Sequence, residues 1–252
     1  MSMEKEPGLS KVPEVTLLFW IIKIVATTLG ETGGDSLSMS MGLGYLLSTG
    51  ILGAIFLAVV AVQIAAKRFN PWLYWTTIVA TTTVGTTLAD FADRSLGIGY
   101  AGGSALLLVL LATSLLIWHR TLGSVEISTV NSPRTEMFYW ITIMFSQTLG
   151  TALGDWTADS AGLGYAGGIV IFAVLLALVA GAYFWGSLSR TVLFWTAFVL
   201  TRPLGAVLGD FLDKPLASGG HALSRCTASA VLVVAIAVCI LVFPQRAARR
   251  VH

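Results

Sequence analysis

Polar residues interrupt alternate hydrophobic stretches of this chain at a regular spacing. A membrane-spanning helix needs about 20 largely apolar residues, and eight stretches meet that length: 15–35, 46–66, 71–91, 101–119, 137–156, 166–186, 191–211 and 222–243. The odd-numbered stretches carry threonines, glycines and acidic residues, whereas the even-numbered ones are almost uniformly apolar. The pattern predicts four polar helices inside a bundle and four apolar helices outside it.

The odd-numbered stretches share one motif, in which a tryptophan is followed ten residues later by a glycine and fifteen residues later by an aspartate. The four sets are Trp20/Gly30/Asp35, Trp75/Gly85/Asp90, Trp140/Gly150/Asp155 and Trp195/Gly205/Asp210. Each repeat contains two helices, so all four repeats point the same way. We therefore expect an all-α integral membrane protein with eight transmembrane helices, arranged as four parallel two-helix repeats in a pseudo-symmetric bundle.

The composition leaves no room for a separate soluble domain. Hydrophobic residues make up 56% of the 252 positions and charged residues only 11%, against roughly 25% charged residues in soluble domains. The expected units are a leader (1–14), repeats at 15–66 and 71–119, a loop (120–136), repeats at 137–186 and 191–243, and a basic tail (244–252).

Basic residues predict the orientation, because cytoplasmic loops of membrane proteins are enriched in lysine and arginine. The side that holds both termini carries Lys5, Lys11, Lys67, Arg68, Arg120, Arg134, Arg190, Arg246, Arg249 and Arg250. The other side carries Arg94 and Lys214, with Arg225 just inside the last helix. We expect an inner (plasma) membrane protein with both termini in the cytoplasm and with its motif aspartates near the outer side.

Carboxylates within membrane spans are energetically expensive and by default mark a functional site. The candidate substrate- or ion-binding residues are Asp35, Asp90, Asp155, Asp210, Glu31, Thr28, Thr83, Thr86, Thr148 and Thr151, with Lys23 and Arg202 as charge partners. Within the spans Arg202 is expected to pair with Asp210, and Lys23 with Glu31 or an acid of a neighbouring repeat. Five acids face these two bases, so three acids have no evident partner. The sequence leaves open whether these acids are protonated, bind a cation or face water. Asp90 and Asp155 are expected to matter most, because their helices carry threonines and no base on the same face.

Carboxylate and hydroxyl oxygens suit hard cations such as Mg²⁺, Ca²⁺ and Mn²⁺. Asp35, Asp90, Asp155, Asp210 and Glu31 are therefore a candidate metal site, and a bound divalent cation is the one cofactor that the sequence suggests. The histidine and cysteines near the candidate carboxylates are His221, Cys226 and Cys239, all in the last repeat, which disfavours copper or zinc. The tryptophans are most simply interfacial anchors, and the motif glycines let helices pack closely.

The chain has no GxxxxGK loop for ATP-driven pumping. It also has no arrangement of nucleophile and base, so an enzyme is not expected. A nucleic-acid partner is not expected either. The leading interpretation is a transporter in the lipid bilayer for a hard divalent cation such as Mn²⁺, with proton coupling open. The alternatives are a cation channel with a four-aspartate ring, a transporter of a small organic solute with Lys23 and Arg202 as anion contacts, and a membrane scaffold. Homo-oligomer formation also stays open.

Four strings of the chain, KIVATTLGETGGD, TTVGTTLADFADRSLGIGY, TLGTALGDWTADSAGLGY and TRPLGAVLGDFLDKP, resemble the repeat signatures of a bacterial family of uncharacterised membrane-anchored proteins. Proteins of that family have four tandem repeats, each with two transmembrane helices and a characteristic tryptophan. The resemblance extends over essentially the whole chain after the leader. It implies an inner-membrane location and an eight-helix repeat fold, and it implies no function.

Overall fold

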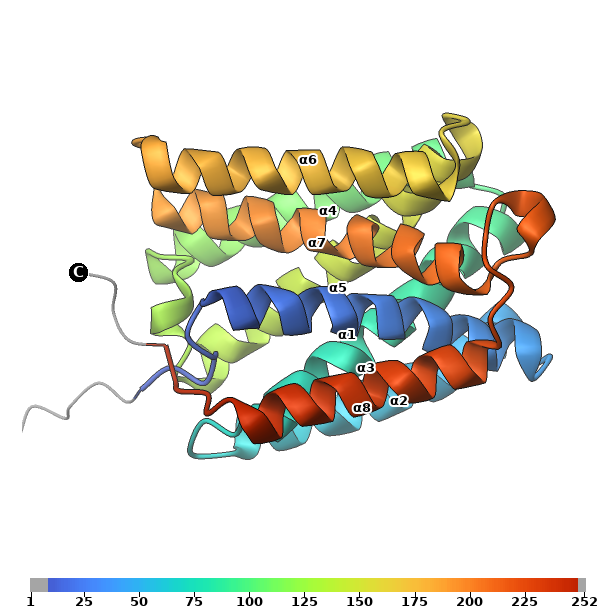
Figure 1. The fold of residues 1–252 in the computed structure, drawn as a ribbon. Coiled ribbons are helices and arrows are strands. Elements are labelled where there is room, and N and C mark those ends of the chain that lie inside the picture. Colours follow the sequence, from blue (N-terminus) through green and yellow to red (C-terminus); the bar gives the residue numbers. More distant parts are fainter. Residues whose placement is uncertain (1–8, 249–252) are drawn as a thin grey trace, which may run out of the picture.

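The computed structural model describes residues 9–248, which form eight long helices lying side by side (Figure 1). The α-helices are α1 Leu17–Asp35, α2 Gly44–Ala65, α3 Pro71–Asp90, α4 Gly99–Leu122, α5 Pro133–Asp155, α6 Gly164–Trp185, α7 Arg190–Asp213 and α8 Arg225–Val242. Three π-helical turns, η1 Ser36–Ser40, η2 Phe91–Ser95 and η4 Trp156–Ser160, extend α1, α3 and α5, and two 3₁₀ turns, η3 Ile127–Thr129 and η5 Leu216–Ser218, lie in loops. The prediction of an all-helical chain built from two-helix repeats is confirmed.

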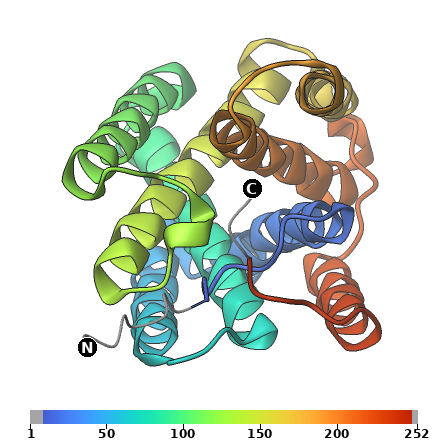
Figure 2. The ribbon, with the colours of Figure 1, turned by 90° about the vertical axis from the view of Figure 1, so that its left-hand side faces the viewer.

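The odd-numbered helices form a closed inner ring. Within it α1 packs on α3, α3 on α5, α5 on α7, and α7 on α1 again. The even-numbered helices lie outside: α2 covers α3, α4 covers α5, α6 covers α7 and α8 covers α1. Figure 2, viewed along the bundle, shows this arrangement of an inner ring with outer helices at the corners. Each outer helix therefore packs on the inner helix of the following repeat, and the last repeat closes the ring on the first.

The outer helices expose most of their apolar side chains, whereas the inner helices bury their polar ones. Within the described residues, six helices are long and apolar enough to cross a membrane: α1 with η1, α2, α4, α6, α7 and α8. Both remaining helices, α3 and α5, are inner helices, and α2 and α4 cover them. Their lower hydropathy follows from polar residues such as Thr81, Thr82 and Gln147 that face the interior.

Pairs of glycines connect the inner helices to the outer helices in the first three repeats. The pairs are Gly42 and Gly44, Gly97 and Gly99, and Gly162 and Gly164, and every member has a positive φ between 64° and 74°. Glycine adopts this left-handed conformation without a steric penalty, so the chain can reverse direction within a few residues. The fourth repeat reverses through the longer segment that contains η5.

Both ends of the described chain lie at the same end of the bundle, which we call the terminal end (Figure 2). Pro13 and Ala247 pair there as an antiparallel bridge. Lys11 Nζ lies 2.6 Å from Glu136 Oε1 and donates hydrogen bonds to the last carbonyl groups of α2. Burial raises the pKa of the Glu136 carboxyl, and the Lys11 ammonium group opposes that shift. Three of the basic residues that we counted on this side, Lys5, Arg249 and Arg250, lie outside the described residues.

Three of the repeated tryptophans, Trp75, Trp140 and Trp195, are buried near the terminal end, whereas Trp20 is partly exposed. Trp75 and Trp140 are 1% and 2% exposed, because the outer helices enclose the inner ring. Beside them, the hydroxyl oxygens of Tyr74 and Tyr139 are 2.6 Å apart and form a hydrogen bond. The buried rings belong to an aromatic core at this end of the bundle, and their position at a membrane interface stays a prediction.

Candidate functional site

Buried side chains at equivalent positions of the four repeats fill the centre of the inner ring. They recur every four residues along each inner helix, so successive sets are about 6 Å apart. We call each set a tier. From the terminal end, the tiers are Phe19, Tyr74, Tyr139 and Phe194 (aromatic tier); Lys23, Ile78, Ile143 and Phe198 (Lys23 tier); Thr27, Thr82, Gln147 and Arg202 (Arg202 tier); Glu31, Thr86, Thr151 and Ala206 (Glu31 tier); and Asp35, Asp90, Asp155 and Asp210 (aspartate tier).

The first pair of motif aspartates shares a guanidinium group. Arg94 lies in η2, four residues after Asp90. Its Nε is 3.0 Å from Asp90 Oδ1, and its Nη2 is 3.1 Å from Asp155 Oδ2 on the next inner helix. Both aspartates are buried, whereas the Arg94 side chain is 30% exposed. Arg94 therefore joins the second repeat to the third.

Lys214 makes the corresponding bridge between the fourth repeat and the first. Its Nζ lies 3.0 Å from Asp210 Oδ1 and 2.6 Å from Asp35 Oδ2. Arg225 at the start of α8 adds a contact of 3.7 Å to Asp35 and an ion pair of 2.9 Å with Asp213. The motif aspartates thus meet at one end of the ring as two bridged pairs.

These bridges correct the charge count made from the sequence. We assigned Arg94 and Lys214 to the outer loops and expected three acids without a partner, which was wrong. Both bases follow a motif aspartate by four residues, in the strings DFADR and DFLDK. A spacing of four places two side chains on one face of a helix, so this spacing was the signal that we missed.

A single guanidinium group connects all four inner helices at the centre. Arg202 of α7 is fully buried, and its Nη2 lies 2.9 Å from Glu31 Oε2 of α1 and 2.6 Å from Thr86 Oγ1 of α3. The same atom donates to Thr151 Oγ1 of α5. From the sequence we paired Arg202 with Asp210. That pairing was wrong, because Asp210 lies two helical turns, about 12 Å, farther along the same helix.

Lys23 has no carboxylate partner among the described residues. Its Nζ is buried, makes no hydrogen bond in the described part of the chain, and lies 4.1 Å from the centre of the Phe198 ring. We expected Lys23 to pair with Glu31 or with an acid of a neighbouring repeat. That expectation was wrong, since Glu31 lies two turns away on the same helix and contacts Arg202 instead.

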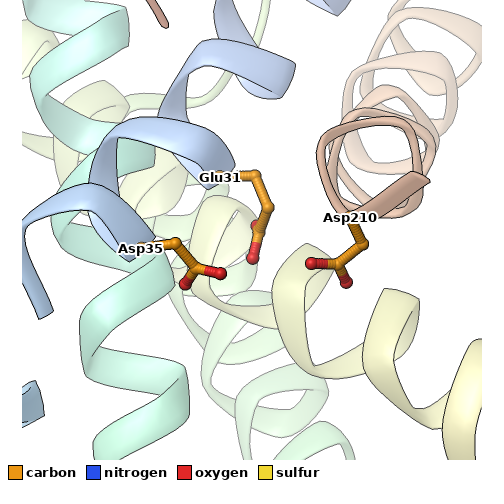
Figure 3. A group of neighbouring side chains, drawn as sticks. All are labelled: Glu31, Asp35 and Asp210. Atoms are coloured by element: carbon orange, nitrogen blue, oxygen red, sulfur yellow. The ribbon is translucent and has the colours of Figure 1, made fainter. Parts of the chain in front are cut away.

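Three carboxylates from two helices come together next to the Lys214 bridge. Glu31, Asp35 and Asp210 each place an oxygen within 4.8 Å of the other two. Figure 3 shows the three side chains converging in the space between α1 and α7. Three carboxylate oxygens at this spacing suit a hard divalent cation. In this conformation Lys214 contacts two of the carboxylates and Arg202 contacts the third.

The predicted threonine ligands fall into two groups. Thr86 and Thr151 contact the Arg202 guanidinium. The others, Thr28, Thr83 and Thr148, donate to carbonyl oxygens four residues earlier in their own helices, at 3.0, 2.7 and 2.9 Å. These bonds hold the second group of hydroxyls on their own helices, so the structure connects only Thr86 and Thr151 to the charged centre.

Asp93 lies in η2 beside Arg94, outside the predicted spans. A methyl group on Gly103 of α4 would overlap the Asp93 carboxylate, so the two residues are in close contact. Burial raises the pKa of Asp93 to about 6, and the Arg94 guanidinium opposes this shift.

A family model described as Repeat of Unknown Function (DUF347) matches the chain four times, over residues 18–69, 73–124, 138–187 and 193–246. The chain belongs to this family. Each matched DUF347 segment holds one inner helix and the outer helix that follows it. Comparisons with curated proteins and with solved structures found no match to the chain.

The four DUF347 repeats are not equivalent in charge. The second and fourth repeats supply the bridging bases Arg94 and Lys214, whereas Met39 and Asp159 stand at the corresponding positions of the first and third. The aspartate tier therefore has twofold rather than fourfold pseudo-symmetry. Glu31 lies beside the two aspartates of the Lys214 bridge.

Proposed function

We propose that this protein is an integral membrane transporter for a hard cation, which binds to Glu31, Asp35 and Asp210 in place of the Lys214 ammonium group. The observation that carries the proposal is the position of Lys214 Nζ, 2.6 Å from Asp35 Oδ2 and 3.0 Å from Asp210 Oδ1. The Lys214 ammonium group thus occupies the position at which a free cation would bind carboxylate oxygens from two helices.

The exposed apolar surface supports a membrane location. All four outer helices are long and apolar enough to span a bilayer, and each inner helix packs against one of them. We infer that all eight helices cross the membrane. The excess of basic residues on the terminal side favours a cytoplasmic location for both termini, which directs the aspartate tier toward the outside.

The charge balance favours exchange between the ammonium group and a substrate cation. Glu31, Asp35 and Asp210 carry three negative charges when ionised, and Lys214 and Arg202 supply two positive charges. If the Lys214 side chain leaves the cluster, two charges are uncompensated, which matches a divalent ion. Lys214 follows the last residue of α7, and its side chain is 13% exposed. It is therefore the most accessible part of this charge cluster.

The arrangement gives less support to a channel with four equivalent aspartates. Such a ring requires free carboxylates facing a common pore. Arg94 and Lys214 instead hold the four aspartates in two pairs. The alternative substrate at the same carboxylates is the proton. If the protein transports no ion, the remaining interpretation is a membrane scaffold.

The chain provides a matched pair of variants for the test. Lys214→Met removes the base from the three-carboxylate cluster, and Arg94→Met removes the equivalent base from a pair without a third carboxylate. We expect Lys214→Met to bind Mn²⁺ more tightly by about tenfold, equivalent to about 1.4 kcal/mol. Arg94→Met should change the dissociation constant of Mn²⁺ much less.

The measurements are Mn²⁺ binding to purified protein and Mn²⁺ and proton flux in proteoliposomes, with monodispersity as the folding control. Equal effects of the two substitutions on Mn²⁺ binding would contradict displacement of Lys214. Failure of the unmodified protein to move Mn²⁺, Mg²⁺, Ca²⁺ or protons above the rate of empty liposomes would contradict transport of a hard cation.

A further inference from the structure

The repeats differ most from one another at three neighbouring tiers in the middle of the ring. The aspartate tier has the same residue in all four repeats, and the aromatic tier has a ring in all four. Between them, single repeats carry residues that the others lack: Lys23, Gln147, Arg202 and Glu31. All four are buried. The departures from repeat symmetry are thus concentrated in the middle of the ring, over a depth of about 12 Å, and the repeated motif does not account for them.

Several buried donors at this depth have no partner within the described residues. Arg202 uses Nη2 for all of its hydrogen bonds, and its Nε and Nη1 make none. Lys23 Nζ and the Gln147 side-chain amide are also without partners in the described part of the chain. The side chains of these three residues are fully buried. Buried donors of this kind are normally satisfied by a protein group, a water molecule or a ligand.

Basic groups outnumber carboxylates at this depth. Lys23 and Arg202 are both buried here, and Glu31 is the carboxylate that contacts Arg202. The aspartates one tier farther away are already held by Arg94 and Lys214. An anion beside both basic groups would hold Lys23 in its protonated form and would accept from Arg202 Nε and Nη1, which have no partner in the described residues.

From these observations we infer a second binding site, for a small inorganic anion such as chloride, between the Lys23 and Arg202 tiers. Lys23 Nζ, Arg202 Nε and Nη1, and the Gln147 amide supply the donors. The close contacts of Gly30, Gly150 and Gly205 with neighbouring helices leave little space in the ring, which favours an ion of atomic size over an organic anion. This site shares Arg202 with the proposed cation site but uses no carboxylate.

The test compares chloride with gluconate, which is too large for the site, at constant ionic strength. Purified full-length protein is transferred to sodium gluconate and titrated with chloride or bromide while the thermal unfolding midpoint is recorded. We expect a saturable rise of the midpoint for the unmodified protein. Lys23→Met and Gln147→Leu should each weaken the apparent halide affinity at least tenfold. Ile143→Met, at the position equivalent to Lys23 in the third repeat, should preserve it.

Bromide can also be located directly by anomalous scattering from crystals grown with bromide, which keeps the test decisive if a variant fails to fold. A bromide peak beside Lys23 and Arg202 would support the inference. No saturable response of the unmodified protein to chloride or bromide would overturn it, as would an unchanged response in both Lys23→Met and Gln147→Leu. Mn²⁺ binding by Lys214→Met is measured in gluconate, so failure of the cation site is distinguished from failure of the anion site.

Discussion

Gly205 of α7 packs directly against Thr27 of α1, with no space between them for an added carbon atom. The same type of contact places Gly30 against Thr82 and Gly150 against Arg202. Small residues allow helices to approach closely in membranes. The repeated motif glycine therefore sets the spacing of the inner ring, and the contact between Gly205 and Thr27 closes it.

Gly205→Ala is expected to destabilise the protein, because the new methyl group would overlap Thr27. Overpacking of this kind costs about 1–3 kcal/mol. Gly50→Ala is the matched control, since Gly50 lies on the exposed surface of α2 and an added carbon there meets nothing within 4 Å. The measurement is the thermal unfolding midpoint in detergent. Equal midpoints for the two variants would show that the ring tolerates a wider spacing.

Arg202→Met is expected to destabilise the protein more than any exposed substitution, because it leaves Glu31 buried without a counter-charge. Breaking a buried ion pair costs about 3–5 kcal/mol, whereas replacing both partners by apolar residues is often neutral. The double variant Glu31→Leu/Arg202→Met should therefore recover most of the lost stability. A double-mutant cycle by thermal or denaturant unfolding measures this coupling, and strictly additive effects would argue against the pair as a stabilising contact.

Asp210→Asn is expected to reduce Mn²⁺ flux at least tenfold, because a hard divalent ion depends strongly on ligand charge. Asp90→Asn should have a smaller effect. From the sequence we expected Asp90 and Asp155 to matter most, since no base was evident on their helical faces. Arg94 removes that reason, because it contacts both carboxylates. Flux in proteoliposomes of monodisperse variants decides between the two rankings.

Asp93→Asn is expected to change how stability depends on pH. Burial raises the pKa of Asp93 to about 6 in the folded protein, above its ordinary value near 4. The folded state therefore binds more protons than the unfolded state between about pH 4 and 6, and Asp93 lowers stability as the pH rises through this window. Relative to the unmodified protein, Asp93→Asn should be more stable above pH 6, and this advantage should shrink below pH 4. Parallel unfolding curves across that range would contradict the prediction.

The sequence predicted the repeat, the number of helices and the division into inner and outer helices, because these depend on local hydropathy and spacing. It did not predict that Arg94 and Lys214 return to the aspartates. That contact depends on helical turns that continue past the apolar segments. The length of an apolar segment does not show where its helix ends. The contacts of Lys23 and Arg202 depend on which helices are neighbours in the ring. Hydropathy does not show which helices are neighbours.

The packing of each outer helix on the following repeat has a consequence for biosynthesis. α1, which precedes the other described helices in the chain, is covered by α8, which follows them. Until α8 emerges, the side of α1 that carries Thr32 has no protein cover, because Thr32 pairs with Ser229 of α8. The cover over Thr32 can therefore form only after α8 has been synthesised, although α1 precedes it by the whole length of the ring.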